Sequence, residues 1–282
     1  MIKEFEAGTF TLNNGVEMPK LGFGTYAAQE SPDFTAAMDH AVETGFRLFD
    51  TASMYGNQID LGNYFANNSG LDRDNYWLTS KVGQQEQGYE ETLAAFKNTT
   101  KELQTDYLDL YLVHWPKEKH MFQTWKALEH LYKEGYVRAI GVSNFEANHL
   151  DRLMLEATVM PAVDQVETHP YFNNHVTRDY MQSLGIQHQA WSPLGQAADL
   201  KDPLIITLAE KYGKTPAQIV LKWHNQNGTA VIPKSTNNKR ITENATIGDF
   251  TLNPHDMALV NLLNRGERIM GAPDENYVND LW

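Results

Sequence analysis

Residues 49–57 read FDTASMYGN. The apolar residues that lead up to Asp50 predict the end of a short strand, and Tyr55 and Gly56 follow in the loop after it. An acid and a tyrosine at this spacing can converge on one spot where a strand gives way to a loop. Taken alone, such a pair more often forms a polar loop that caps the next helix.

Two later strand ends favour a more specific interpretation. Lys81 closes the predicted strand at 77–81, and His114 closes the apolar run that starts at Leu108. Three consecutive predicted strands therefore each carry an ionisable residue at or just beyond the carboxyl end. A barrel of parallel strands gathers these ends around one mouth, so we expect the residues to face one another there.

The rest of the chain alternates strand-like and helix-like segments, with no linker between them. The predicted strands are 21–26, 47–49, 77–81, 108–114, 137–142, 162–166, 186–191 and 230–232. They are continuous apolar runs, which is typical of strands buried on both faces. This pattern predicts an α/β fold, a single (β/α)8 TIM barrel over 1–282, rather than a doubly wound sheet with a second domain.

Additions to the barrel are also predicted. The Asn-Gly dipeptide at 14–15 lies between two short apolar segments and predicts an N-terminal β-hairpin, which we expect to plug the bottom of the barrel. Helices that begin at a proline are predicted at 202–203, 215–216 and 253–254. In total, the pattern predicts two helices more than the eight of a barrel.

Composition restricts the class of protein. The chain has 282 residues, a net charge of −13 and no cysteine. The acidic balance argues against a nucleic-acid partner, and the lack of cysteine excludes disulfides and thiol nucleophiles. We predict neither a signal peptide nor a membrane span, and expect a cytoplasmic protein.

The strand-end residues have a consistent acid–base chemistry. A tyrosine with an ordinary pKa of about 10 is a poor acid at neutral pH. A nearby Lys81 ammonium lowers the pKa of Tyr55, and Asp50 beside the lysine keeps that lysine charged. Tyr55 then becomes a proton donor to a carbonyl oxygen, and a neutral His114 can orient the same oxygen. Alternatively, Lys81 and Asp50 form only a structural ion pair.

Several motifs resemble one family. They are GFGT at 22–25, FDTA at 49–52, YGN at 55–57, TSK at 79–81, DYLDLYLVHWP at 106–116, GVSNF at 141–145, SPLG at 192–195 and IPKS at 232–235. In this order they resemble the aldo-keto reductases, and within them the branch of 2,5-diketo-gluconate reductases and prostaglandin F synthases. The resemblance implies a monomeric barrel that uses NADPH to reduce an aldehyde or ketone to the alcohol. It also implies that Tyr55 is the proton donor and that Asp50, Lys81 and His114 are its catalytic partners.

The resemblance also implies a set of cofactor contacts. Ser143, Asn144 and Gln165 match positions that bind the nicotinamide carboxamide, and Trp191 matches the position whose ring stacks on the nicotinamide, where most relatives have Tyr. Lys234, Ser235, Thr236 and Arg240 resemble the clamp for the adenosine 2′-phosphate. Further implied cofactor contacts are Thr25, Ser192, Leu194 and Asn244.

The substrate pocket is less clearly indicated. The resemblance places Tyr26, Trp77 and Trp115 in its aromatic wall, beside His114. In longer members of the family that the chain resembles, the loop at 117–120 builds one side of the pocket. The loop is short here, so the resemblance implies an open mouth and a broad substrate range. The tail from around Met270 to Tyr277 is expected to supply the remaining wall.

Two other functions remain open on the sequence. A metal-dependent barrel hydrolase needs His and carboxylate ligands from several strand ends, and His114 and Asp50 supply only the beginning of such a set. A non-catalytic NADPH-binding regulatory barrel is the second, although a pure binder has no use for the tyrosine with its partners.

Overall fold

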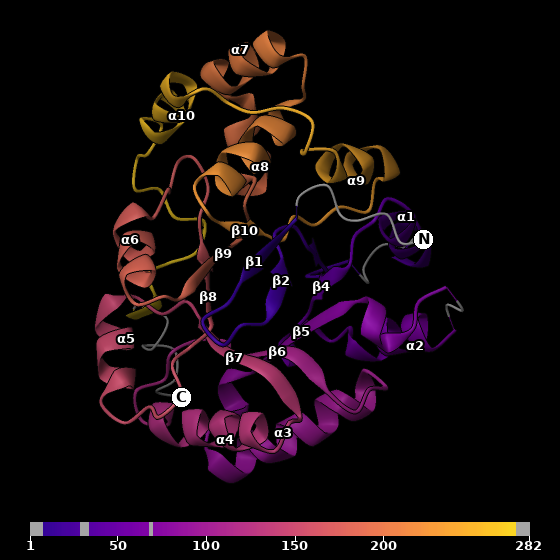
Figure 1. Cartoon of the computed structure of the whole chain (residues 1–282), viewed down its shortest axis with the longest axis vertical. Coiled ribbons are helices and arrows are strands. Elements are labelled where there is room, and N and C mark those ends of the chain that lie inside the picture. The colour runs from indigo at the N-terminus through magenta and orange to yellow at the C-terminus, as the bar shows by residue number, and fades with distance from the viewer. Residues whose placement is uncertain (1–7, 29–33, 68–69, 275–282) are drawn as a thin grey trace.

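The computed structural model describes residues 8–28, 34–67 and 70–274. Eight parallel strands form one curved sheet in the order β10-β9-β8-β7-β6-β5-β4-β3 (Figure 1). Their bounds are β3 Phe23–Gly24, β4 Leu48–Asp50, β5 Trp77–Val82, β6 Leu108–Val113, β7 Val137–Ser143, β8 Val163–Glu167, β9 Gln187–Trp191 and β10 Ala230–Val231. The first and last predicted strands are longer than the regular segments observed. The strand order is the sequence order throughout, as in a (β/α)8 barrel.

The sheet closes on itself between its first and last strands. Leu21 and Val231 form a parallel bridge. The N–H of Gly22 donates to the Val231 carbonyl at 2.8 Å, and the Val231 N–H donates to the Lys20 carbonyl at 3.0 Å. The predicted barrel is confirmed, and closure leaves no open edge between these two strands.

The helices surround the strands (Figure 1). Their bounds are α1 Phe34–Glu43, α2 Gln58–Asn67, α3 Tyr89–Glu102, α4 Met121–Lys133, α5 Ala147–Met154, α6 His175–Ser183, α7 Pro203–Tyr212, α8 Pro216–Gln226, α9 Asn238–Ala245 and α10 Pro254–Asn261. Two more helices follow the strands than a minimal barrel has, as predicted. The side chains of Asp202, Thr215 and Asn253 cap α7, α8 and α10, and each cap is followed by a proline. None of these helices, over the described part of the chain, has the length and hydropathy required to cross a bilayer.

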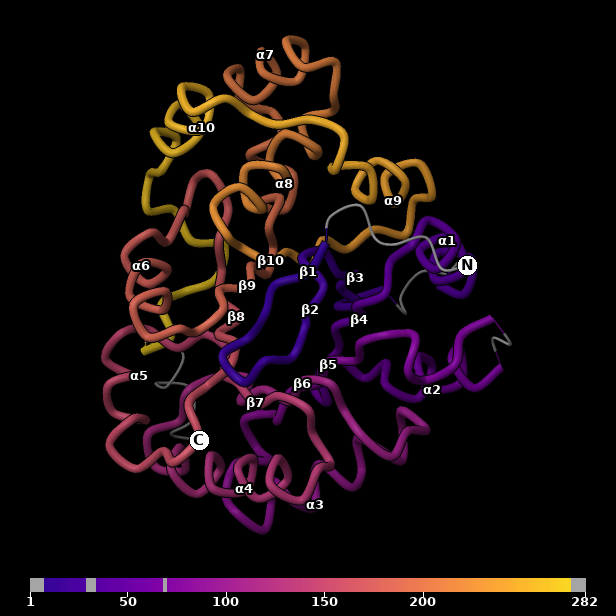
Figure 2. Tube along the Cα trace, viewed as in Figure 1, coloured from indigo at the N-terminus to yellow at the C-terminus, as the bar shows by residue number. Residues whose placement is uncertain are grey.

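The N-terminal hairpin consists of β1 (Thr9–Thr11) and β2 (Glu17–Pro19), and lies across one end of the barrel (Figure 2). Leu12 and Met18 are buried against residues of the barrel interior, among them Leu48 and Trp77. The Asn13 side chain donates to the Pro161 carbonyl at 2.9 Å. The hairpin therefore closes the end where the strands begin, as predicted, and leaves the opposite end for a site.

One buried acid lies among the strands without strong partners. Asp164 of β8 is fully buried, and neither carboxylate oxygen makes a hydrogen bond of normal geometry with a described residue. Burial raises the pKa of Asp164 well above its ordinary value, although the backbone of Phe145 partly opposes this.

We expect Asp164→Asn to stabilise the protein increasingly as pH rises. An acid whose pKa is raised in the folded state contributes its full stabilisation below its unfolded pKa, and that contribution is lost progressively as pH rises through the folded pKa. The asparagine does not titrate, so the melting temperature of the variant should exceed that of the wild type more at pH 8 than at pH 5. Each kcal/mol corresponds to roughly 2–4 °C in a domain of this size class.

Asp109→Asn is the matched control for this experiment. Asp109 is equally buried but pairs with Arg73 at 2.8 Å and Arg138 at 2.7 Å, so its replacement should lower the melting temperature. A difference between Asp164→Asn and the wild type that stays constant from pH 5 to pH 8 would contradict the assignment.

Candidate active site

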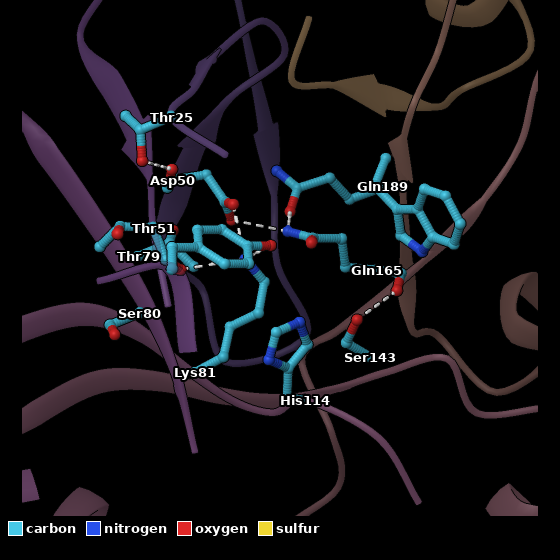
Figure 3. Close-up of polar contacts among 12 residues, drawn as sticks. Thr25, Asp50, Thr51, Thr79, Ser80, Lys81, His114, Ser143, Gln165 and Gln189 are labelled. Atoms are coloured by element: carbon cyan, nitrogen blue, oxygen red, sulfur yellow. Dashed lines mark hydrogen bonds and ion pairs between the residues drawn. The ribbon is translucent and has the colours of Figure 1, made fainter. Parts of the chain in front are cut away.

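A buried ion pair lies at the carboxyl ends of two neighbouring strands. Asp50 is the last residue of β4 and Lys81 the penultimate residue of β5. Their side chains are almost completely buried, and Lys81 Nζ lies 2.5 Å from Asp50 Oδ1 (Figure 3). The ammonium also donates to the Thr51 carbonyl at 3.0 Å. Although burial lowers the pKa of Lys81, the Asp50 carboxylate outweighs it, and the net pKa is raised. The lysine is therefore charged in its buried position.

Tyr55 reaches this pair from a short turn after β4. Residues Ser53–Tyr55 form a 3-10 turn that ends at Gly56 with φ of 67°, a left-handed conformation that glycine adopts without strain. Lys81 Nζ donates to the Tyr55 hydroxyl oxygen at 3.3 Å. The acid–tyrosine spacing in the sequence therefore brings Asp50 and Tyr55 to the same ammonium, which donates to both.

The pKa of Tyr55 differs in direction from the sequence prediction. Burial raises this pKa, the Lys81 ammonium lowers it and the Asp50 carboxylate raises it, so that the net pKa lies above the ordinary value. Lys81 thus acts in the predicted sense, but the prediction of a lowered net pKa was wrong because it left out burial. Tyr55 keeps its proton at neutral pH.

His114 lies on the other side of the tyrosine ring. It directly follows β6, and the two rings meet edge to face with centroids 5.6 Å apart. Burial, and then the Lys81 charge, hold the pKa of His114 well below its ordinary value. The imidazole is therefore neutral, and one of its nitrogens carries a proton that can be donated to an acceptor.

Four side chains from β7, β8 and β9 form the other half of the mouth. Ser143 Oγ donates to the Gln165 carbonyl at 2.8 Å, and Asn144 Nδ2 donates to the His114 carbonyl at 2.9 Å. Trp191 Nε1 donates to Asn144 Oδ1 at 2.8 Å. The indole is thereby held in place at the end of β9, with its amide partner fixed by a second hydrogen bond.

Gln165 joins the two halves of the site. Its Nε2 donates to Asp50 Oδ2 at 2.7 Å and to Gln189 Oε1 at 2.8 Å (Figure 3). Its Oε1 accepts no hydrogen bond within the described part of the chain. Gln189 was not predicted, because an isolated glutamine in a strand carries no recognisable signal.

These residues surround a cavity of about 810 Å³. Of the residues predicted from the sequence, the cavity is lined by Thr25, Tyr26, Asp50, Tyr55, His114, Trp115, Ser143, Asn144, Gln165, Trp191, Ser192, Leu194 and Lys234. Lys81 lies beneath Tyr55 and Asp50, fully buried. Met54 and Ile269 also line it without having been predicted. Met270, the first residue of the predicted tail wall, lines it as well, whereas residues 275–277 of that prediction lie outside the described residues. Within the described ranges, no group of His, Asp and Glu is arranged to hold a metal ion.

The placement of Trp77 in the pocket wall is wrong. Trp77 is the first residue of β5, pairs with Leu48, and packs with Leu12 and Met18 of the hairpin at the closed end of the barrel. It does not line the cavity. Trp77 and Lys81 are four residues apart and so face the same side of the strand, but at opposite ends of it.

The predicted phosphate clamp follows β10 and is only partly at the cavity. Lys234 lines it and is exposed, with no ion pair to another described residue. Ser235 and Thr236 lead to α9, whose first turn is capped by Asn237 through the Arg240 N–H at 3.1 Å. The Arg240 side chain is exposed, whereas Asn244 is nearly buried. The role of these residues stays a prediction.

Comparison with known proteins relates this geometry to a family. The model of the aldo/keto reductase family matches residues 20–265. The chain is 45% identical over 267 residues to the glyoxal reductase of Bacillus subtilis (strain 168), covering 95% of this chain and 96% of that protein.

Solved structures agree with this match. An aldo-keto reductase from a Medee basin deep-sea metagenome library has a TM-score of 0.91 at 40% identity, over 94% of this chain and 98% of that one. An aldo-keto reductase of Bombyx mori, solved in complex with NADP, has a TM-score of 0.89 at 29% identity, over 95% of this chain and 96% of that one.

Proposed function

Because the chain belongs to the aldo/keto reductase family, we propose that it is an NADPH-dependent oxidoreductase that reduces an aldehyde or ketone to the alcohol, with Tyr55 as the proton donor. The observation that carries this proposal is the contact of 3.3 Å between the Lys81 ammonium and the Tyr55 hydroxyl, beside a neutral His114 at the same cavity. A protonated phenol and a neutral imidazole are two donors for one carbonyl oxygen. Lys81 lies behind them, fully buried, and Asp50 holds it there.

The side chains of the mouth suit a nicotinamide ring. Gln165 Oε1 is an unused acceptor, and the Trp191 ring, fixed by Asn144, offers a flat face beside it. The Bombyx mori relative, solved with NADP, supports this choice of cofactor. When bound, the reduced nicotinamide supplies the hydride that reduces the carbonyl carbon.

Tyr55 and His114 act on the carbonyl oxygen. Both donate hydrogen bonds to this oxygen and so polarise the carbonyl group. As the carbon gains hydride, the electron pair of the C=O π bond moves to the oxygen, which takes the proton from the Tyr55 hydroxyl. The phenolate left behind is stabilised by the Lys81 ammonium, which Asp50 keeps charged. His114 stays neutral and orients the oxygen.

Lys234 and Arg240 are the cations that we assign to the 2′-phosphate of NADPH. Both are exposed and have no ion pair with a described residue, although the protein carries a net charge of −13. A phosphate with close to two negative charges is the complementary group, and the flat guanidinium can bind two of its oxygens.

Tyr55→Phe should reduce aldehyde turnover with NADPH by about 10²-fold or more, because the substitution removes the proton donor and leaves the ring. NADPH affinity should change little. The decrease in nicotinamide absorbance measures turnover, and Tyr107→Phe, which removes a hydroxyl bonded to Asp74 outside the cavity, is the control. A variant that retains more than a tenth of the wild-type rate would exclude Tyr55 as the donor.

Lys81→Met should shift the pH dependence of alcohol oxidation to higher pH. Oxidation needs the phenolate as base, so its rate rises as pH passes the pKa of Tyr55. Lys81 lowers that pKa, and removing the charge raises it further. Lys81→Arg retains a cation and tests whether charge restores the profile. If Lys81→Met folds and shows the wild-type pH profile, the lysine has only a structural role.

Arg240→Ala should raise the dissociation constant for NADPH about tenfold and leave that for NADH nearly unchanged, because only NADPH carries the phosphate. Quenching of tryptophan fluorescence measures both constants. Lys239→Ala is the matched control, since it removes a neighbouring exposed charge that pairs with Glu243 at 3.8 Å. Equal losses for the two cofactors would show that Arg240 supports the fold rather than the phosphate.

A further inference from the structure

Three buried ionisable side chains lie beside the cavity, outside the catalytic group. They are Glu167 at the end of β8, His169 two residues later and Asp199 in the loop after β9. His169 Nε2 lies 3.1 Å from Glu167 Oε1, and His169 Nδ1 lies 2.9 Å from Asp199 Oδ2. The imidazole therefore bridges two carboxylates, using both of its nitrogens.

This arrangement requires a charged imidazole. Both ring nitrogens must donate, because each faces a carboxylate oxygen, and only the imidazolium has two N–H donors. Burial alone lowers the pKa of His169, but its hydrogen bonds to Asp199 and Glu167 raise it to about 9. The three side chains form a buried cluster in which an imidazolium lies between two carboxylates.

Glu167 holds the C-terminal segment against the cavity. Its carboxylate accepts the backbone N–H of Ile269 and, at 3.3 Å, that of Met270. Both of these residues line the cavity. The same segment has another anchor nearby. The backbone carbonyl of Tyr171, two residues after His169, accepts the N–H of Arg265 at 2.9 Å.

Asp199 holds the loop that follows β9. A Cβ at Gly195 would lie 2.4 Å from the Asp199 carboxylate, so the loop folds closely over this acid. Ser192, Gln196 and Ala197 have φ of 45°, 48° and 70°, a left-handed conformation that is strained for residues other than glycine. Such a conformation persists only where surrounding contacts impose it. Ser192, Leu194 and Gln196 of this loop line the cavity.

We propose that His169 is a positioning residue that couples two walls of the active site, holding the Ile269–Met270 segment through Glu167 and the loop at 192–201 through Asp199. The proposal rests on the proposed function, together with the expectation from the sequence that the tail around Met270 contacts the substrate and that Ser192 and Leu194 contact the cofactor. His169 does not touch the reacting groups. It acts by keeping two carboxylates close together that would otherwise repel each other in a buried place.

Hydrogen–deuterium exchange of the purified protein tests the coupling without any assay of turnover. Three variants are compared with the wild type: Glu167→Gln, Asp199→Asn and His169→Gln. Glu167→Gln should speed exchange at least threefold in 265–274 and leave 192–201 unchanged. Asp199→Asn should do the reverse. His169→Gln should speed exchange in both segments.

His188→Gln is the matched control for loss of a buried histidine. His188 bonds to Thr168 and Thr229, both at 2.9 Å, and contacts neither the C-terminal segment nor Asp199 through a hydrogen bond. This variant should leave exchange in both segments near the wild-type rate. Unchanged exchange in both segments of His169→Gln, or equal increases there in His169→Gln and His188→Gln, would overturn the proposal. If His169→Gln does not fold, the exchange rates of Glu167→Gln and Asp199→Asn test the proposal. It would be overturned if either variant increased exchange equally in 265–274 and in 192–201.

An activity measurement separates this inference from the proposed function. With NADPH and an aldehyde, His169→Gln should raise KM for the aldehyde and the dissociation constant for NADPH several-fold each, with kcat changed less than twofold, because Tyr55 and Lys81 are not disturbed. A large fall in kcat with unchanged KM would contradict a positioning role. A wild-type protein without turnover would contradict the proposed function, and the exchange experiment would still test the coupling.

Discussion

The buried pair of Lys81 and Asp50 is the constraint on which the active site depends. Moving two charges out of water costs several kcal/mol for each ion, and this is recovered only if every hydrogen-bonding direction is used. The ammonium accordingly donates to Asp50, Thr51 and Tyr55, and Asp50 accepts in addition from Gln165 on β8. These partners come from strands on opposite sides of the barrel. A shift in register of any of them would leave a buried charge unpaired, so the requirements of the fold and of the site coincide.

In the proposed reaction, the same pair explains how Tyr55 can serve as the acid. Burial makes the phenolate unfavourable, so the resting tyrosine keeps its proton, and the net effect is a raised pKa. The Lys81 ammonium lies 3.3 Å from the hydroxyl oxygen, and its electrostatic attraction to that oxygen is strongest after the proton has left, when the oxygen belongs to a phenolate. The site is therefore arranged to stabilise the charge that develops during the reaction rather than one present at rest. His114, held neutral by burial and by the same ammonium, can donate to the carbonyl oxygen without adding a charge that would compete with it.

The sequence was sufficient to predict the barrel and to predict that Asp50, Tyr55, Lys81 and His114 lie together, because both depend on where strands end. Apolar runs locate strands to within one or two residues, and residues at the carboxyl ends of parallel strands must lie near one another. It was harder to predict at which end of the barrel a strand residue lies. Trp77 shares a face with Lys81 but lies about 13 Å away at roughly 3.3 Å per residue, which places it against the hairpin. The net pKa of Tyr55 depends on burial by distant segments, and the link from His169 to Ile269 depends on a segment 100 residues away. Neither leaves a local pattern in the sequence.

A chain of hydrogen bonds links the catalytic pair to Trp191. Asp50 accepts from the Gln165 side chain, and the backbone carbonyl of Gln165 accepts from Ser143. Asn144, which follows Ser143, donates to the His114 carbonyl and accepts from the Trp191 indole. Each amide has its N–H groups directed at a protein acceptor, which leaves the Gln165 oxygen as the group available to a ligand. Asn144 lies at φ of 63°, a conformation that asparagine tolerates better than most residues. A phenol at position 191 would carry its donor at the far end of the ring, whereas the indole N–H lies along the ring edge and reaches Asn144. Through Asn144, the tryptophan ring that we assign to the cofactor is therefore linked to the backbone of His114, which we assign to the substrate.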